Sequence, residues 1–268
     1  MSVGIVFGAS AGIGAAIAKE IAGLDRECPD EMWLVARRAG KLEEVAAGMD
    51  HDNVRIVPGD VCDTEFLAEL SEKIKKENKI LSWVAIAPGI GNYGEFEALS
   101  HSDVMTCAEL NVTAFANILH EMLPFMGRNS HVITLASGGA FFPQPGFALY
   151  GATKSFALNL SKAVGCEVRS RGIYVTAVCP GPCDTAFLDN ATNGNGIPMY
   201  KRKFLTSPAN VASKAVRAAI RKNKVCLPTF SMKLLYAFRG IIPENLVMRM
   251  AKSKNKIEKP LQKTLDKN

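Results

Sequence analysis

The hydrophobic and polar positions of the chain alternate between two patterns. Seven short runs are rich in β-branched and other apolar residues, and they occupy Val3–Phe7, Met32–Ala36, Val54–Pro58, Trp83–Ala87, His131–Ala136, Ile173–Val178 and Val225–Leu227. Most segments between these runs repeat apolar residues every three or four positions, which is helical spacing. Continuous apolar strands separated by helices indicate parallel strands that are buried on both sides. We therefore predict an α/β fold, a doubly wound parallel sheet of about seven strands with helices on both faces.

The series continues without a linker, an internal repeat or a low-complexity segment before residue 190. A chain of 268 residues, 48% of them hydrophobic, is long enough to bury one large core. We predict one domain over residues 1–230, followed by a basic amphipathic extension over residues 231–268. The last ~15 residues have too few apolar side chains to fold alone, so we expect them to be disordered.

A glycine-rich turn, GASAGIG, joins the first predicted strand to the first predicted helix at residues 8–14. Glycines let the backbone approach a pyrophosphate closely, and the free N–H groups at the start of a helix attract its negative charge. The turn therefore predicts a dinucleotide site. The alternative is a tight strand-to-helix turn that serves packing only.

The end of the second predicted strand indicates which dinucleotide would bind. Proteins that bind NAD usually place an acid there, ~20 residues beyond the glycines, to hold the ribose hydroxyls. This chain has Ala36 followed by Arg37 and Arg38, which leaves space and positive charge for a 2′-phosphate. NADP (NADPH) is therefore the expected cofactor, and Arg37 ranks ahead of Arg38 because it directly follows the position of the acid. The alternative is a pair of solvated arginines at the start of a helix.

The segment YGATK places Tyr150 and Lys154 four residues apart. Residues 149–165 have helical composition, so both side chains are expected on one face, one turn apart. An ammonium close to a phenol favours the phenolate, and we therefore expect Lys154 to hold the Tyr150 pKa below its free value of about 10. Such a pair is a candidate general acid/base near neutral pH, although Tyr and Lys also share helix faces by chance.

These residues and several further motifs resemble the short-chain dehydrogenase/reductase family in its common single-domain form. The similarity spans residues 3 to about 230. Its motifs are GxxxGxG at residues 8–14, Asp60-Val61, Asn111, Ser137, the YxxxK motif of Tyr150 and Lys154, and PGPCDT at residues 180–185. Ser137 lies 13 residues before Tyr150, the spacing usual in that family. The resemblance implies a Rossmann fold and an NADP-dependent oxidoreductase that transfers a hydride between nicotinamide and a secondary alcohol or ketone.

The resemblance implies catalytic roles for four residues, Asn111, Ser137, Tyr150 and Lys154. Tyr150 would donate or accept the proton of the substrate hydroxyl, and Ser137 would hydrogen-bond the same oxygen. Lys154 would lower the tyrosine pKa and bind the nicotinamide ribose. Asn111 would distort its helix and support a water that links Lys154 to solvent.

The resemblance also implies a set of cofactor-binding residues. Ser10 and the Ile13 amide would hold the phosphates. Asp60 and the Val61 amide would hold the adenine, and Cys183 and Thr185 would hold the nicotinamide carboxamide. The full expected set is Gly8, Ser10, Gly12, Ile13, Gly14, Arg37, Arg38, Asp60, Val61, Gly89, Tyr150, Lys154, Pro180, Gly181, Cys183 and Thr185. Four of the catalytic and cofactor-binding residues have structural alternatives: Asp60 as a turn acid, Asn111 as a cap or core amide, Ser137 as a strand-end hydroxyl, and Thr185 as a helix cap.

Two positions depart from the family pattern. The NNAG that usually follows the fourth strand is replaced by residues 86–89, Ile-Ala-Pro-Gly, and Phe7 stands where a threonine often precedes the first glycine. The first departure removes side-chain amides that would brace the cofactor wall. A catalytically idle NADP(H)-binding protein that acts through its partners therefore stays open as an alternative to an enzyme.

The expected substrate is a small-molecule hydrophobic ketone or alcohol. In this fold the loop after the sixth strand closes over the substrate, so residues 186–206 are the predicted lid. The predicted lining is mostly apolar and comprises Phe141, Phe142, Phe147, Phe187, Met199, Tyr200 and Phe204, with Pro143 and Pro145 shaping the wall. It favours a bulky hydroxysteroid or bile acid and hence a role in lipid metabolism. An acyl-chain ketoreductase is the alternative. A structural interpretation of the same residues assigns half of these side chains to the core.

The basic residues gather in the last quarter of the chain. Residues 201–268 contain 17 Lys and Arg against 3 Asp and Glu, although the whole chain has a net charge of only +6. Leu234, Leu235, Phe238 and Ile241 are expected to share one apolar helix face, and Pro243 opens a second helix with Leu246, Val247 and Met250. Two interpretations stay open: peripheral contact with an anionic membrane, or packing on the sheet or on a sister subunit.

Composition excludes several other classes. The seven cysteines are scattered and form no CxxC pair, which argues against a disulfide framework and against a metal site. No apolar run reaches the ~20 residues of a membrane span, and the amino terminus lacks a secretory pattern, so the expected location is cytoplasmic. No aromatic stacking set accompanies the basic tail, so no nucleic acid is expected as a partner. The resemblance implies a homodimer or homotetramer.

Overall fold

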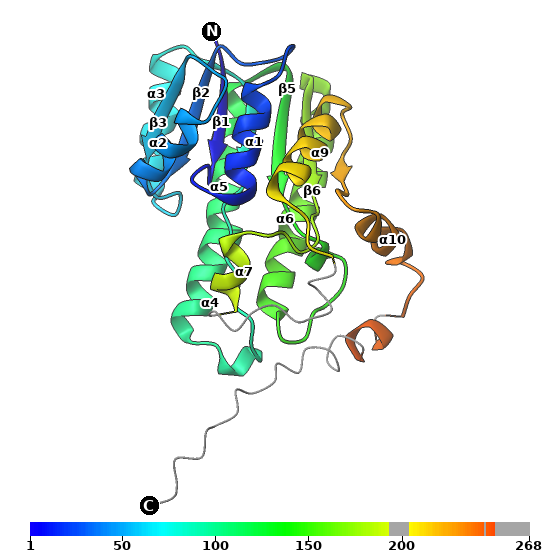
Figure 1. Ribbon diagram of the computed structural model, residues 1–268. Helices are drawn as coiled ribbons and strands as arrows, with labels where there is room; N and C mark the ends of the chain where they lie inside the picture. The colour runs from blue at the N-terminus through cyan, green and yellow to red at the C-terminus, as the bar shows by residue number, and fades with distance from the viewer. Residues whose placement is uncertain (193–203, 244, 250–268) are drawn as a thin grey trace, which may run out of the picture.

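The structure is a computed structural model that describes residues 1–192, 204–243 and 245–249. Seven parallel strands form one sheet in the order β3-β2-β1-β4-β5-β6-β7 (Figure 1). The strands are β1 (Ser2–Phe7), β2 (Glu31–Ala36), β3 (Val54–Pro58), β4 (Ile80–Ile86), β5 (Met126–Leu135), β6 (Ile173–Val178) and β7 (Val225–Cys226). The predicted doubly wound α/β sheet is confirmed, and the predicted strands differ from the observed ones only at their ends.

Helices cover both faces of this sheet. The α-helices are α1 (Gly12–Ala22), α2 (Ala39–Ala47), α3 (Thr64–Lys76), α4 (His101–Ala108), α5 (Phe115–Met122), α6 (Ala148–Glu167), α7 (Ala186–Ala191), α9 (Pro208–Ile220) and α10 (Phe230–Phe238), and residues 245–249 are also helical. One core holds α3, α5 and α6 against one face, and a second core holds α1, α2 and α9 against the other. Figure 1 shows α1 and α9 on the near side of the sheet.

The two cores explain why the strands are apolar at nearly every position. In β4, Val84 and Ile86 point into the core of α3, α5 and α6, whereas Trp83 and Ala85 point into the core of α1, α2 and α9. Successive side chains of a strand alternate between faces, so a strand covered on both sides needs apolar residues throughout.

The strand order places a crevice at the carboxyl ends of β1 and β4. β1 lies between β2 and β4, and the chain leaves β1 towards one face of the sheet and leaves β4 towards the other. The carboxyl ends of neighbouring strands then diverge, which is the usual place for a ligand in an open α/β sheet. The glycine turn at Gly8 follows β1, and the wall of residues 87–91 follows β4.

The carboxy-terminal segment returns to the body of the protein through α10. Met232, Leu235, Tyr236 and Val247 pack against a small core beneath the turn at Gly138–Ala140. The predicted division of the chain at residue 230 stays a prediction, and the predicted disorder of the last residues lies outside the described ones. Among the residues described here, no helix combines the length and the apolar character needed to cross a lipid bilayer.

Candidate active site

The glycine turn between β1 and α1 forms a cradle that larger residues would fill. Gly8 and Gly12 have positive φ values of 76° and 58°, a region that favours glycine. A Cβ on Gly14 would lie 2.2 Å from the Gly8 carbonyl oxygen, which is inside van der Waals contact. No side chain caps the start of α1, and its first turn carries no acid. Free N–H groups and the positive end of the helix dipole therefore remain for an anion.

A cavity of about 820 Å³ runs from this turn across the carboxyl ends of β4, β5 and β6. Fourteen of the predicted site residues line it: Gly8, Ser10, Gly12, Ile13, Gly14, Arg38, Gly89, Ser137, Tyr150, Lys154, Pro180, Gly181, Cys183 and Thr185. The structure thus brings together residues that are up to 177 positions apart in the sequence. Within this set, the Thr185 hydroxyl donates a hydrogen bond to the Cys183 carbonyl at 3.3 Å.

The two arginines after β2 occupy different positions. The Arg38 guanidinium lines the cavity and lies 3.4 Å from the Ser10 hydroxyl. The Arg37 side chain is 78% exposed and forms an ion pair of 3.7 Å with Asp60, outside the cavity lining. Asp60 also accepts a hydrogen bond from the Cys62 amide at 3.0 Å. The geometry therefore favours Arg38 over Arg37, the reverse of the sequence-based ranking, while the adenine roles of Asp60 and Val61 stay predictions.

Asn111 lies behind the cavity wall, inside a π-helical segment, Glu109–Ala114. Its amide oxygen accepts from the Ile90 N–H at 3.0 Å, and its amide nitrogen donates to the Ile90 carbonyl at 2.7 Å and to Thr153 at 3.0 Å. These bonds tie the segment after β4 to α6. Asn111 thus supports residues 87–91, the cavity wall that lacks the family's asparagines. As expected, Asn111 lies in a distorted helix.

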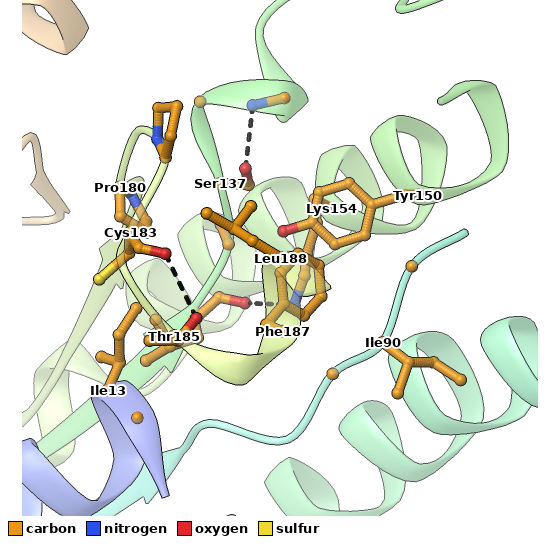
Figure 2. Close-up of a pocket in the computed structure, with 18 of the residues that line it drawn as sticks. Ile13, Ile90, Ser137, Tyr150, Lys154, Pro180, Cys183, Thr185, Phe187 and Leu188 are labelled. Carbon is orange, nitrogen blue, oxygen red and sulfur yellow. Dashed lines mark hydrogen bonds between the residues drawn. The ribbon is translucent and has the colours of Figure 1, made fainter. Parts of the chain in front are cut away.

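Ser137, Tyr150 and Lys154 face the cavity together (Figure 2). Ser137 follows β5, and its hydroxyl accepts a hydrogen bond from the Gly139 amide at 3.1 Å and hydrogen-bonds the Tyr150 phenol. Tyr150 and Lys154 lie one turn apart on α6, as predicted from their spacing. The Lys154 ammonium donates to the Leu135 carbonyl at 2.9 Å and lies 5.8 Å from the centre of the tyrosine ring.

Burial controls the ionisation of the tyrosine and the lysine. It raises the pKa of Tyr150 to about 12, an effect that the hydrogen bond from Ser137 opposes, and it lowers the pKa of Lys154 to about 8. The prediction that Lys154 holds the Tyr150 pKa below its free value is therefore wrong for the protein alone. The reason is that both groups are desolvated, and the ammonium bonds to a backbone carbonyl instead of the phenol.

Aromatic rings enclose the phenol. Phe147 stacks on Tyr150 with 4.3 Å between ring centres, and Tyr93 stacks on the other side of Phe147 at 3.9 Å. Phe187, from α7, tilts over Tyr150 at 5.3 Å. Gly91 makes room for this stack, because a Cβ there would lie 2.7 Å from the tyrosine ring. These rings exclude water from the phenol, which accounts for its high pKa.

The predicted substrate lining is only partly observed. Phe142, Phe147, Phe187, Phe204 and Pro143 line the cavity. Phe141 instead packs in the small core, edge-to-face with Tyr236 at 5.1 Å, so its assignment to the lining is wrong. Met199 and Tyr200 lie outside the described residues, as does most of the predicted lid, and Pro145 is not among the lining residues.

The far wall of the cavity comes from the carboxy-terminal segment, which the sequence did not reveal. Ser231, Met232, Leu235 and Val247 line the cavity. The Met232 sulfur lies 2.3 Å from where a Cβ on Gly138 would stand, so only glycine admits it there. Helical spacing did indicate an apolar face on α10, but Leu235 points inward whereas Leu234, Phe238 and Ile241 are exposed. The predicted single apolar face is therefore corrected to two.

Comparison with known proteins agrees with this geometry. The sequence model for the family described as short chain dehydrogenase matches residues 2–196. The serine 3-dehydrogenase of Rhizobium radiobacter is 29% identical over 199 residues, covering 71% of this chain and 76% of that protein. The sulfoacetaldehyde reductase of Chromohalobacter salexigens is 28% identical over 200 residues, with the same coverage of each chain. A solved short-chain dehydrogenase from Sphingobium yanoikuyae, in complex with NADPH, has a TM-score of 0.73 at 22% identity and covers 91% of this chain and 97% of that one.

The family match spans well over half of the chain, and it includes the glycine turn, Ser137, Tyr150 and Lys154. The chain therefore belongs to the short chain dehydrogenase family. It is an oxidoreductase of that class, with the Rossmann-like fold that its sequence predicted.

Proposed function

We propose that the protein is an NADP(H)-dependent oxidoreductase that transfers a hydride between nicotinamide and a secondary alcohol or ketone. The observation that carries this proposal is the joint position of Ser137, Tyr150 and Lys154 at one cavity, whose other end is the glycine turn. A proton-transfer group and an anion cradle on one continuous cavity suit a reaction between a dinucleotide and a second, smaller molecule.

The residues at the turn fit NADP. The glycine cradle and the uncapped start of α1 suit a pyrophosphate, and the Arg38 guanidinium beside Ser10 suits a 2′-phosphate. Ala36 stands where a protein that prefers NAD would carry an acid. The short-chain dehydrogenase from Sphingobium yanoikuyae was solved in complex with NADPH, which supports the same choice. Cys183 and Thr185 would contact the nicotinamide end, and Asp60 and Val61 the adenine.

The side chains around the phenol have complementary roles. Tyr150 would donate its proton to the developing alkoxide in reduction and accept it back in oxidation, while Ser137 hydrogen-bonds the same substrate oxygen. A bound nicotinamide would supply the hydride donor or acceptor. Lys154 would hold the ribose hydroxyls, and Asn111 would keep the wall and the lysine helix in register.

A bulky hydrophobic substrate, of hydroxysteroid or bile-acid size, suits the far wall. Phe142, Met232, Leu235 and Val247 present apolar surface there, and the aromatic stack lies beside the phenol. The two named relatives carry the names of small polar substrates. However, the family match ends at residue 196, whereas the α10 wall begins at Phe230, so this wall lies outside the matched region. A ketoreductase of acyl chains is the second candidate, because the same surface suits an alkyl chain.

Oxidation of NADPH by the purified protein tests the proposal. The panel comprises steroid ketones, bile-acid ketones, β-ketoacyl thioesters, sulfoacetaldehyde and small ketones, each with the wild type and Tyr150→Phe. Serine is an alcohol, so it is tested in the reverse direction, by reduction of NADP⁺. We expect turnover of one bulky apolar class and its loss, by about 10³-fold, in Tyr150→Phe. Turnover of serine or sulfoacetaldehyde alone would overturn the substrate proposal. NADPH binding without turnover of any compound would favour the idle binding protein.

A further inference from the structure

Exposed apolar side chains concentrate on the carboxy-terminal segment. Most large hydrophobic residues in the described chain are buried, but five exposed ones lie between residues 230 and 246: Phe230, Leu234, Phe238, Ile241 and Leu246. Phe230 and Ile241 are 78% and 74% exposed, more than any other large hydrophobic residue in the described chain. A cluster of this kind marks an interaction surface, whereas single exposed hydrophobics need no explanation.

The cluster follows the periodicity of the helix. Phe230, Leu234 and Phe238 are four residues apart, so they form one stripe along α10, and Ile241 continues it past the helix end. The opposite side of α10 carries Met232 and Leu235, together with Tyr236, which pack on the body of the protein. We call the stripe of Phe230, Leu234, Phe238 and Ile241 the outer face. α10 is thus anchored by one apolar face and presents a second one, at the edge of the molecule in Figure 1.

The charge beside the outer face is positive. Lys233, Arg239 and Arg249 are exposed on this segment, against one acid in the sequence of residues 230–249, Glu244. Lys233 is the cation nearest the stripe along the helix, whereas the Arg239 guanidinium stacks 3.6 Å from the Tyr236 ring on the side of α10 that faces the body of the protein. The sequence that follows, residues 250–268, adds six lysines against two acids.

We propose that the outer face of α10 binds the surface of an anionic lipid bilayer. Aromatic and aliphatic side chains enter the boundary between headgroups and acyl chains, while Lys and Arg beside them pair with lipid phosphates. A second copy of the chain is the less suitable occupant, because a two-fold contact through this face would bring the Lys233 of each copy to the same contact with no acid of α10 to pair with it. Leu235 and Val247 belong to the same segment and line the cavity, so docking would place the cavity wall beside the bilayer.

Vesicle flotation of the full chain tests this inference independently of the reaction. The probes are vesicles of phosphatidylcholine alone and of phosphatidylcholine with roughly one third phosphatidylglycerol. We expect at least about tenfold more bound protein on the anionic vesicles, and a decrease when salt is raised. The triple variant Leu234→Gln, Phe238→Gln, Ile241→Gln should lose this binding. The matched control is Phe96→Gln with Met105→Gln, which removes two exposed hydrophobics elsewhere and should bind as the wild type does.

A second variant separates the charge from the apolar stripe. Lys233→Gln with Arg239→Gln should retain the outer face but reduce the preference for anionic over neutral vesicles by several fold. Circular dichroism and NADPH binding verify that each variant is folded. Absence of vesicle binding, or equal binding to neutral and anionic vesicles, would overturn the proposal. It would also be overturned by a wild-type dimer in light scattering that the triple variant converts to a monomer, because a second copy would then cover this face.

Discussion

The two ends of the cavity are built in different ways. The glycine cradle at the cofactor end consists of residues close together in the chain: β1, the glycine turn and the start of α1 form one continuous segment. The substrate end instead combines the turn at Gly138–Ala140 with Met232 and Val247 from a remote segment. A local motif is a property of the backbone and allows few substitutions, whereas a wall of packed side chains depends on tertiary contacts and is easier to change.

Lys154 lies between the two ends of the cavity, and its substitution should lower the activity of the protein while raising its stability. We expect Lys154→Met to lower the reduction rate by about 10³-fold, because the ammonium that we propose to hold the cofactor ribose is lost. The same substitution should raise the free energy of unfolding at pH 7. Burial lowers the folded pKa of Lys154 to about 8, so the folded chain binds fewer protons than the unfolded chain between that value and the ordinary lysine pKa.

The sign of this effect gives its pH dependence. A group with a lowered folded pKa destabilises the native state below that pKa, and the penalty disappears above the unfolded pKa. The free energy of unfolding of Lys154→Met should therefore exceed that of the wild type by about 3 kcal/mol at pH 7 and by only about 1 kcal/mol at pH 9.5. The hydrogen bond to Leu135, which the variant loses, reduces both differences by the same amount. Urea denaturation at both pH values measures this, with Lys76→Met as the exposed control. If the difference in unfolding free energy between variant and wild type is the same at both pH values, the conclusion that burial lowers the pKa of Lys154 is wrong.

Substitution of Gly14 should impair cofactor binding at the glycine cradle. A Cβ there would meet the backbone oxygen of Gly8 at 2.2 Å, and the backbone has no freedom to yield without opening the turn. Such strain costs about 1–3 kcal/mol, so Gly14→Ala should weaken NADPH binding by up to about 100-fold. Fluorescence titration of NADPH measures the change. Gly40→Ala is the matched control, because no atom lies within 4 Å of the position of its Cβ, and equal affinities in the two variants would refute the cradle.

The choice between NADPH and NADH should depend on Arg38. Arg38→Ala removes the guanidinium beside Ser10 and should weaken NADPH binding by about tenfold without changing NADH binding. Arg37→Ala is the control, because its side chain points to Asp60 outside the cavity lining. Titration of both variants with both nucleotides decides the question. If Arg37→Ala loses more NADPH affinity than Arg38→Ala does, Arg37 is the more important arginine, as the sequence predicted.

Substitutions at the substrate end of the cavity should have smaller effects than those at the cofactor end. Met232→Ala removes a partly buried side chain that packs on Gly138 and lines the cavity, so KM for the preferred substrate should rise by about three- to fivefold with little change in kcat. Leu234→Ala on the opposite side of α10 is the control and should leave KM unchanged. Steady-state kinetics with the best substrate of the panel measures both variants. An equal effect of the two substitutions would show that α10 acts through stability alone.

The sequence by itself determined the architecture and the centre of the site. Alternating apolar runs predicted seven parallel strands, and the spacing of Tyr150 and Lys154 placed them on one helix face, because strand and helix periods are local properties of the chain. The glycine turn was likewise recognisable, since only glycine permits its backbone angles and close contacts. These features depend on residues a few positions apart.

Only the tertiary structure decided the rest. It oriented Arg38 rather than Arg37 to the cavity, brought Met232 against Gly138, and desolvated Tyr150 until its pKa rose to about 12. Each of these outcomes depends on contacts between segments that are distant in the chain, and on the exclusion of water that such contacts cause. Residue spacing carries no information about either, so the direction of a side chain and the strength of its charge became known only from the packed fold.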